Sequence, residues 1–258
     1  MIKFFRRIRK KLLKENKFKT YIFYAVGEIA LVVIGILIAL YLDNVNEQNA
    51  IEKKQENHLR LIMGEMTNNL DSLQTEREAL GKILMSNRLI ISLFNNQEKI
   101  DTLSESYLSD ILFMPLTRQI KFDNENGALT ELLASGGLKD IKNDTIRSVL
   151  ASWDAKLSVF QSQEAGLYKS FNVAHNLVRK KGSFRVIFDQ LGLSEYLEIS
   201  VASDTESNKH FLTSKEFENI MLNYLAIGDQ LYRKYYPSYQ KDLEQLIKII
   251  NQELSSKK

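Results

Sequence analysis

An apolar run of 22 residues, from Tyr21 to Leu42, constrains this chain more than any other feature of its sequence. The run reads YIFYAVGEIALVVIGILIALYL and holds a single charged residue, Glu28. As an α-helix it would extend about 33 Å, which matches a hydrocarbon layer about 30 Å thick. Residues 21–42 are therefore predicted to form a transmembrane helix. A buried helix in a soluble core is the alternative, and the strong hydropathy of the run disfavours it.

The residues around the run predict an uncleaved signal anchor. A cleaved signal peptide has an apolar stretch of about 7–15 residues followed by small residues. This run is longer, and it ends in the bulky pair Tyr41-Leu42. Residues 1–20 contain nine Lys or Arg residues and one acid, Glu15, whereas the rest of the chain holds 26 basic and 31 acidic residues. Because positive charge stays on the cytoplasmic side, residues 1–20 are predicted to be cytoplasmic and the body from residue 43 extracytoplasmic.

The basic segment itself has a helical pattern. Phe5, Ile8 and Leu12 recur at helical spacing with cations between them. An amphipathic helix of this kind lies on an anionic leaflet, with its cations near the headgroups. The candidate lipid contacts are Arg6, Arg7, Arg9, Lys10, Lys11 and Lys14. A topology signal alone would explain the same charges, and nucleic acid is disfavoured because the adjoining bilayer already supplies anionic partners.

Glu28 and a row of small residues suggest that the transmembrane helix meets another helix. Glu28 would lie roughly 12 Å below the start of the run, where a charge costs a few kcal/mol. The carboxyl group could carry a proton, bond to Tyr24 one turn earlier, or meet a partner helix. Small residues at a spacing of four allow close helix approach. The predicted association face consists of Gly27, Glu28, Leu31, Gly35 and Ala39.

The remainder of the chain is predicted to be all-α. It has only two prolines, Pro115 and Pro237, and no cysteine, which excludes disulfides, thiol catalysis and cysteine zinc sites. A polar stalk begins at residue 43, and apolar residues then follow alternating steps of three and four from Leu59 to Phe94. Eight of these eleven positions are apolar, and the exceptions are Asn69, Glu76 and Asn87. The apolar stripe is wider than a two-stranded coiled-coil seam, so it predicts a bundle face.

The sequence thus divides into four predicted parts: a basic segment (1–20), a transmembrane helix (21–42), a stalk and long amphipathic helix (43–95), and a helical bundle (96–258). Asp101 or Thr102 is expected to start a helix that ends before Pro115. A second helix is expected from about Ala128 to the glycine pair at 136–137. Asn143 is expected to cap a long helix that ends at Gly182.

Apolar periodicity is strongest in that long helix. Strict three-four alternation gives Leu150, Trp153, Leu157, Phe160, Glu164, Leu167, Phe171, Ala174 and Val178, of which all but Glu164 are apolar. Residues 183–208 are ambiguous between strand and helix. A capping box at 213–216 predicts the last helical region, with a break or kink at Pro237.

No pattern in the sequence predicts catalysis. The chain lacks phosphate-binding glycine loops and a nucleophile elbow, and its histidines (His58, His175 and His210) are far apart in sequence. Glu164 could be a catalytic acid, but a polar residue in an apolar stripe more commonly sets helix register. We therefore expect no enzyme activity and no cofactor.

Three segments resemble an uncharacterised family of single-pass membrane proteins from Bacteroidota, defined by a domain of unknown function. They are MIKFFRRIRKKLLKENKF, YAVGEIALVVIGILIAL and LLASGGLKDIKNDTIRSVLASW. Gly27, Glu28 and Gly35 match the membrane motif of that family. The resemblance implies a Gram-negative inner membrane and a periplasmic body, and it implies no activity.

These features together favour a membrane-anchored periplasmic module that binds other envelope proteins or forms a homo-oligomer. One alternative is a ligand sensor that signals through the transmembrane helix, and another is an accessory subunit of a proton-driven envelope machine that uses Glu28. A bundle pocket lined by converging polar groups would favour sensing. A filled core with an exposed apolar strip would favour assembly.

Overall fold

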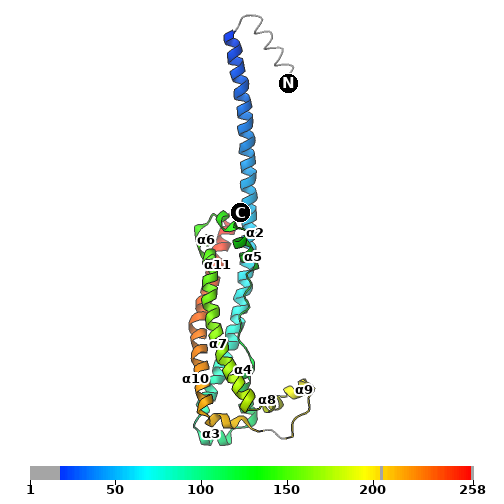
Figure 1. The fold of residues 1–258 in the computed structure, drawn as a ribbon, viewed down its shortest axis with the longest axis vertical. Coiled ribbons are helices and arrows are strands. Elements are labelled where there is room, and N and C mark those ends of the chain that lie inside the picture. The colour runs from blue at the N-terminus through cyan, green and yellow to red at the C-terminus, as the bar shows by residue number, and fades with distance from the viewer. Residues whose placement is uncertain (1–17, 204–205, 257–258) are drawn as a thin grey trace. The chain divides into compact units, whose positions relative to one another are not determined.

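The computed structural model describes residues 18–203 and 206–256, and within these ranges the chain is helical with no β-strand (Figure 1). The prediction of an all-α protein is confirmed. The chain divides into two units, Met1–Asn57 and His58–Lys258. The boundary falls inside the predicted stalk, within the helix α2 (Phe18–Leu93).

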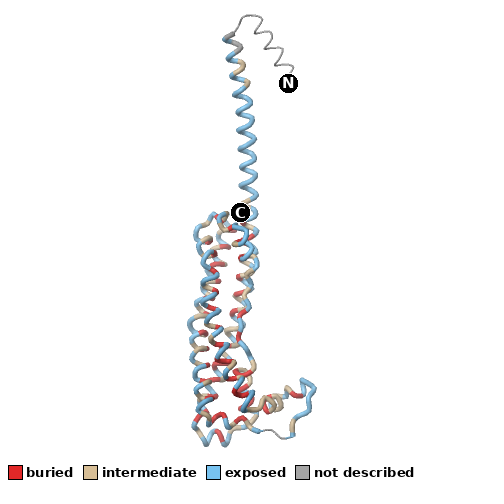
Figure 2. The backbone as a smooth tube through the Cα atoms, viewed as in Figure 1, coloured by how far each residue is buried: buried red, intermediate tan, exposed pale blue. Residues whose placement is uncertain are grey.

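In the first unit, the described residues form the beginning of α2. Among the residues that the structure describes, this is the one helix long and apolar enough to cross a membrane. Its apolar side chains are exposed, as the pale blue colour of Figure 2 shows; they include Phe23, Leu31, Val32, Leu37 and Leu40. A helix that is apolar all round and exposed suits lipid better than water.

The second unit is a bundle built on three long columns. These are α2 from His58 onward, α7 (Trp153–Lys181), and α10 (Lys215–Gln230) followed by α11 (Tyr236–Ser255). The columns pack closely: a Cβ added at Gly228 of α10 would lie 2.6 Å from Leu84 of α2 and 3.3 Å from Leu167 of α7. Glycine at this position therefore allows three helices to meet.

Shorter elements lie between the columns in the sequence. They are α3 (Gln97–Thr102), α4 (Glu105–Thr117), α5 (Gly127–Ala134), the 3-10 helix η1 (Gly137–Asp140), α6 (Asp144–Ala151), α8 (Phe184–Gln190), α9 (Leu193–Tyr196) and the 3-10 helix η2 (Asn208–Thr213). The π-helical turn η3 (Leu231–Tyr235) joins α10 to α11.

Both predicted apolar stripes face the core. All nine positions from Leu150 to Val178 are buried, including Glu164. The eight apolar positions of the α2 stripe are also buried, and so are Asn69 and Asn87. Burial of a leucine or isoleucine side chain contributes about 1.5–3 kcal/mol, so both stripes stabilise the packing of the columns.

The prediction for the first connecting helices is wrong. Asn96, not Asp101 or Thr102, caps α3, where its side chain accepts from the Lys99 amide. Ser104 caps α4 and accepts from the amide of Tyr107. α4 continues past Pro115 and ends at Thr117, although the proline has no amide hydrogen to donate to the preceding turn.

The middle of the chain follows the prediction with one correction. Gly136 has a φ of 69° and follows α5, as expected for a glycine cap. Asn143 accepts from the amides of Thr145 and Ile146, so it is the predicted cap. The helix that it starts ends at Ala151, however, and α7 begins anew at Trp153. The apolar phase is unchanged across this break.

The last regions resolve two open questions. Of the segment SFRVIF, Ser183 caps α8 and the remaining residues lie in that helix. Ser214, one residue after the predicted Thr213, caps α10 by accepting from Phe217. Pro237 lies in the first turn of α11, just after the π-helical turn, which is the irregularity expected near a proline.

Candidate functional site

The most distinctive site in the bundle surrounds a non-helical segment between α4 and α5, residues Arg118–Asn126, which we call the strap. Ile120 and Phe122 of the strap are each 4% exposed, so the segment is partly embedded in the core. An extended segment cannot satisfy its own backbone groups, and burying them unpaired is costly. Side chains of α2 and α7 supply partners for several of these backbone groups.

Asn69 of α2 binds the strap through a reciprocal pair of hydrogen bonds. Its Nδ2 donates to the carbonyl oxygen of Glu125 at 2.7 Å, and its Oδ1 accepts from the Glu125 amide at 2.7 Å. Asn68 adds a bond from Nδ2 to Oε2 of Glu125 at 2.9 Å. The fully buried Asn69 side chain therefore pairs both backbone groups of Glu125, as a neighbouring β-strand would.

Glu76, the second polar position in the α2 stripe, binds the other end of the strap. Its Oε1 accepts from Nη2 of Arg118 at 2.5 Å, and its Oε2 accepts from the Lys121 amide at 3.2 Å. The Glu76 side chain is 12% exposed, so the ion pair is shielded from solvent on this side. A shielded, hydrogen-bonded ion pair is stronger than an exposed one.

Glu65 of α2 binds the first residues after the strap. Its two carboxylate oxygens accept from the amides of Ala128 at 2.6 Å and Leu129 at 3.4 Å. These amides belong to the first turn of α5, whose own flanking residue, Asn126, makes no side-chain cap. Glu65 thus serves as the N-terminal cap from another helix, where negative charge is also favoured by the helix dipole.

Glu164 of α7 completes the site from the opposite side. Its Oε1 accepts from the Phe122 amide at 3.1 Å and from the Tyr236 hydroxyl at 3.2 Å. Burial raises the pKa of the Glu164 carboxyl from 4.5 to about 7, and the two hydrogen bonds oppose this rise only in part. Since both donors contact Oε1, the other oxygen can carry a proton without breaking either bond.

An aromatic cluster holds the strap next to Glu164. Phe122 lies edge-on to Phe160 of α7 at 5.6 Å and to Tyr239 of α11 at 5.8 Å between ring centroids. The Tyr239 hydroxyl donates to Oδ1 of Asn124 at 3.3 Å. Edge-on aromatic contacts add to the energy of burial. The strap therefore joins α2, α7 and α11.

This geometry explains three of the four polar residues in the apolar stripes. Asn69, Glu76 and Glu164 each bind the strap. The strap-binding role of Glu164 accounts for its burial without a catalytic function. Asn87 differs, because both atoms of its buried amide lack a hydrogen-bond partner, and nothing in the described structure explains it.

The histidines do not form a metal site. Nδ1 of His175 lies 2.8 Å from the carbonyl oxygen of Leu116, and the ring of His210 contacts the carbonyl oxygens of Ser207 and Lys181. Within residues 18–203 and 206–256, no group of three or more His, Asp or Glu side chains is placed to hold a metal ion.

The predicted association face lies on α2 in the first unit. Its members are Gly27, Glu28, Leu31, Gly35 and Ala39. A Cβ added at Gly27 or Gly35 would meet no atom within 4 Å, so the backbone is open to an approaching helix at both positions. The predicted lipid contacts (Arg6, Arg7, Arg9, Lys10, Lys11 and Lys14) lie outside the described residues.

Two surface hollows that sequence reasoning missed lie between α7 and the α10–α11 column. One hollow of about 410 Å³ is lined by Gly166 and Val173 of α7 and by Ile220 and Ile227 of α10, among others. A second hollow, of about 220 Å³, lies between Val159 of α7 and residues of η3 and α11. We call these two hollows together the α7 groove; its walls are mostly apolar.

The sequence indicates the α7 groove only weakly. Ser162, Gly166 and Ser170 are small residues on α7, and Val159 and Val173 are exposed on the same helix. Apolar side chains outside the buried stripe are common on helix surfaces. Only the packing of α10 beside α7 turns these residues into a groove.

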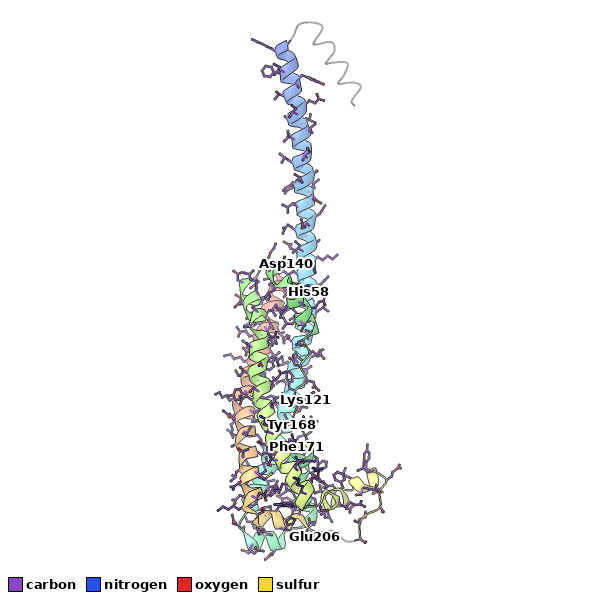
Figure 3. All side chains as sticks on the ribbon, viewed as in Figure 1. His58, Lys121, Asp140, Tyr168, Phe171 and Glu206 are labelled. Carbon is purple, nitrogen blue, oxygen red and sulfur yellow. The ribbon has the colours of Figure 1, made fainter. Side chains whose placement is uncertain are left out.

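Figure 3 shows the side chains around these regions, with Lys121 of the strap and Phe171 of α7 labelled. Comparisons of the chain with protein-family models, curated proteins and solved structures find no match. A function for this chain must therefore be inferred from its own residues.

Proposed function

We propose that this protein is a single-pass membrane protein whose helical body works by binding other proteins or further copies of itself, without catalysing a reaction. The α7 groove is the observation that carries this proposal. It is open and mostly apolar, and it lies between two antiparallel columns. Grooves of this kind receive an amphipathic helix or a row of apolar side chains.

The contrast with a ligand pocket supports this choice. Small-molecule sites are concave and combine apolar walls with a few convergent polar groups. The larger hollow of the α7 groove has a mostly apolar wall, and two of its polar lining residues, Ser170 and Asn223, are bonded to each other. The convergent polar groups of the bundle, at Glu164 and Asn69, are already occupied by the strap.

The proposal includes the position of the protein in the cell. Residues 1–20 lie in the cytoplasm, the first part of α2 crosses the inner membrane of a Gram-negative bacterium, and the bundle lies in the periplasm. The charge of residues 1–20, the length and apolarity of residues 21–42, and the resemblance to the Bacteroidota family support this placement.

Site-directed crosslinking in native membranes tests the proposal. The chain has no cysteine, so Val173→Cys and Val159→Cys each introduce a single attachment point for a photo-crosslinker in the α7 groove. Met85→Cys is the matched control, because it is an exposed apolar residue on α2. We expect protein adducts from positions 159 and 173 and none from position 85, detected by mass spectrometry. Recovery of uncrosslinked monomer from all three variants would contradict the proposed function.

A further inference from the structure

A second exposed apolar surface lies at the α9 loop, which we define as residues 193–203. Four of its residues expose large apolar side chains: Tyr196 (83% exposed), Leu197 (50%), Ile199 (41%) and Val201 (68%). Figure 1 shows α9 and the chain after it extending sideways beyond α8, away from the three columns. Exposed apolar side chains are normal when they are scattered, but four within six residues form a patch.

The loop that carries this patch is held in one conformation. The carboxylate of Asp189, at the end of α8, accepts from the Ser194 hydroxyl, from the Ala202 amide at 3.2 Å and from Nε of Arg185 at 3.1 Å. Residues 194 and 202 are thereby tied to one side chain. Ser194 also accepts, through its carbonyl oxygen, from the Ile199 amide at 2.9 Å. A pre-organised loop loses less entropy when it binds.

The charge around the patch has one sign. From Val186 to Asn208 the sequence contains no Lys, Arg or His, and it contains Asp189, Glu195, Glu198, Asp204 and Glu206. Arg185, which precedes the segment, is paired with Asp189. Within the α9 loop the exposed charged residues are Glu195 and Glu198, which an anionic lipid surface repels and a basic protein surface attracts.

We propose that the α9 loop is a docking surface for a protein partner that has an apolar groove edged with Lys and Arg. This inference rests on the proposed function, since it names the partner chemistry of an interaction module. Tyr196, Leu197 and Val201 enter the groove, and Glu195 and Glu198 face its basic edge. A small, rigid, apolar centre with a charged border is the usual anatomy of a protein interface.

Peptide binding to the full chain in nanodiscs of neutral lipid tests this chemistry. An environment-sensitive dye is attached at Ser200→Cys in the loop or, as a control, at Gln245→Cys on the exposed face of α11. The probes are two amphipathic helical peptides of equal length, one of leucine and lysine and the other of leucine and glutamate. We expect the lysine peptide to change the signal at position 200 at a concentration at least about tenfold lower than the glutamate peptide, with no change at position 245.

Two double variants separate charge from apolar contact. In E195K/E198K the preference should reverse toward the glutamate peptide. In L197S/V201S, which keeps every charge, binding of the lysine peptide should weaken by about tenfold or more. Equal response to both peptides, no response at position 200, or undiminished binding by L197S/V201S would each overturn the proposal.

Two other occupants are distinguished in the same preparation. Added vesicles of phosphatidylglycerol should leave the dye at position 200 unchanged, and a spectral shift would assign the loop to lipid instead. A photo-crosslink from Ser200→Cys to a second copy in native membranes would likewise overturn the proposal. Adducts from Val173→Cys and Val159→Cys report the α7 groove independently, so their persistence would show that only the α9 loop inference had failed.

Discussion

The two parts of α2 place similar apolar residues in different surroundings. Up to Leu42 the helix exposes apolar side chains on all sides, including Leu31 and Leu37. From Leu59 to Phe94 a stripe of apolar side chains is buried, and the apolar residues outside the stripe, such as Leu61, remain exposed. Helical propensity alone therefore does not tell the two parts apart. The distribution of apolar residues around the helix indicates whether lipid or other helices surround it.

The space around the glycines also differs between the two parts of α2. Space around Gly27 and Gly35 in the first part is empty within 4 Å, whereas a Cβ at Gly81 in the second part would lie 3.2 Å from the Tyr232 ring. Gly27 and Gly35 are thus both open, whereas in the second part Gly81 lies against another helix and Gly64 is open. The bundle completes its interface within the chain, while the first part of α2 keeps a face on which a further helix can pack.

The largest expected effect comes from the buried stripe. Leu80→Ala should lower the free energy of unfolding by about 2–5 kcal/mol, because it removes a fully buried side chain and leaves a cavity. Leu61→Ala, at an exposed position of the same helix, should change it by less than about 0.5 kcal/mol. Denaturant titration of the full chain in detergent measures both, with fluorescence of the single, buried Trp153 as the probe. An equal loss of unfolding free energy in Leu80→Ala and Leu61→Ala would contradict the burial of only one face of this helix.

Glu164 should make the stability of the bundle depend on pH. Its pKa is about 7 in the folded chain and 4.5 ordinarily, so between these values the folded state binds more protons than the unfolded state. Stability from this group therefore falls as pH rises from about 4.5 to about 7, by about 3 kcal/mol in total. Glu164→Gln should lack this component, and unfolding titrations at pH 5 and pH 8 compare the two chains. If stability depends on pH equally in both chains, Glu164 is not the group responsible.

The two buried asparagines of the α2 stripe form a matched pair. Asn69→Leu should destabilise the bundle by about 1–3 kcal/mol, because it leaves the amide and carbonyl of Glu125 without partners. Asn87→Leu should be neutral or stabilising, because it removes a buried amide that has no partner. Thermal unfolding of both variants measures the difference. Destabilisation of similar size in each would show that the strap does not depend on Asn69.

The smallest effect is expected in the first part of α2. Gly35→Leu should reduce helix association in the membrane by about fivefold and leave the unfolding of the bundle unchanged. Val33→Leu, on another face, is the control for added volume. Energy transfer between two labelled populations in vesicles measures association. If neither substitution alters energy transfer, the small-residue face does not mediate association.

Periodicity predicted the elements that depend on apolar spacing. The α7 stripe, the end of α5 at Gly136 and the cap at Asn143 follow from residues close together in sequence. Periodicity did not reveal the break before Trp153, because α6 and α7 keep the same apolar phase across it. Asn96 and Ser104 were missed because several cap-forming residues lie nearby, and packing decides among them.

The strap could not be predicted from spacing. Asn69 and Glu125 are 56 positions apart, and their contact involves backbone groups that every residue possesses. The sequence marked Asn69, Glu76 and Glu164 as exceptions to apolar stripes without indicating what they bind. The α7 groove was missed for the same reason, since its two walls come from distant helices.

The attachment of the strap to α11 has a consequence for how the chain matures. Tyr236 and Tyr239, which donate hydrogen bonds to Glu164 and Asn124, are synthesised after the other side chains that bind the strap. We expect the first helices of the bundle to pack together before the strap is ordered. The strap should become fully ordered only after α11 has been synthesised. A chain truncated before Tyr236 should therefore be cleaved by an added protease faster than the full chain.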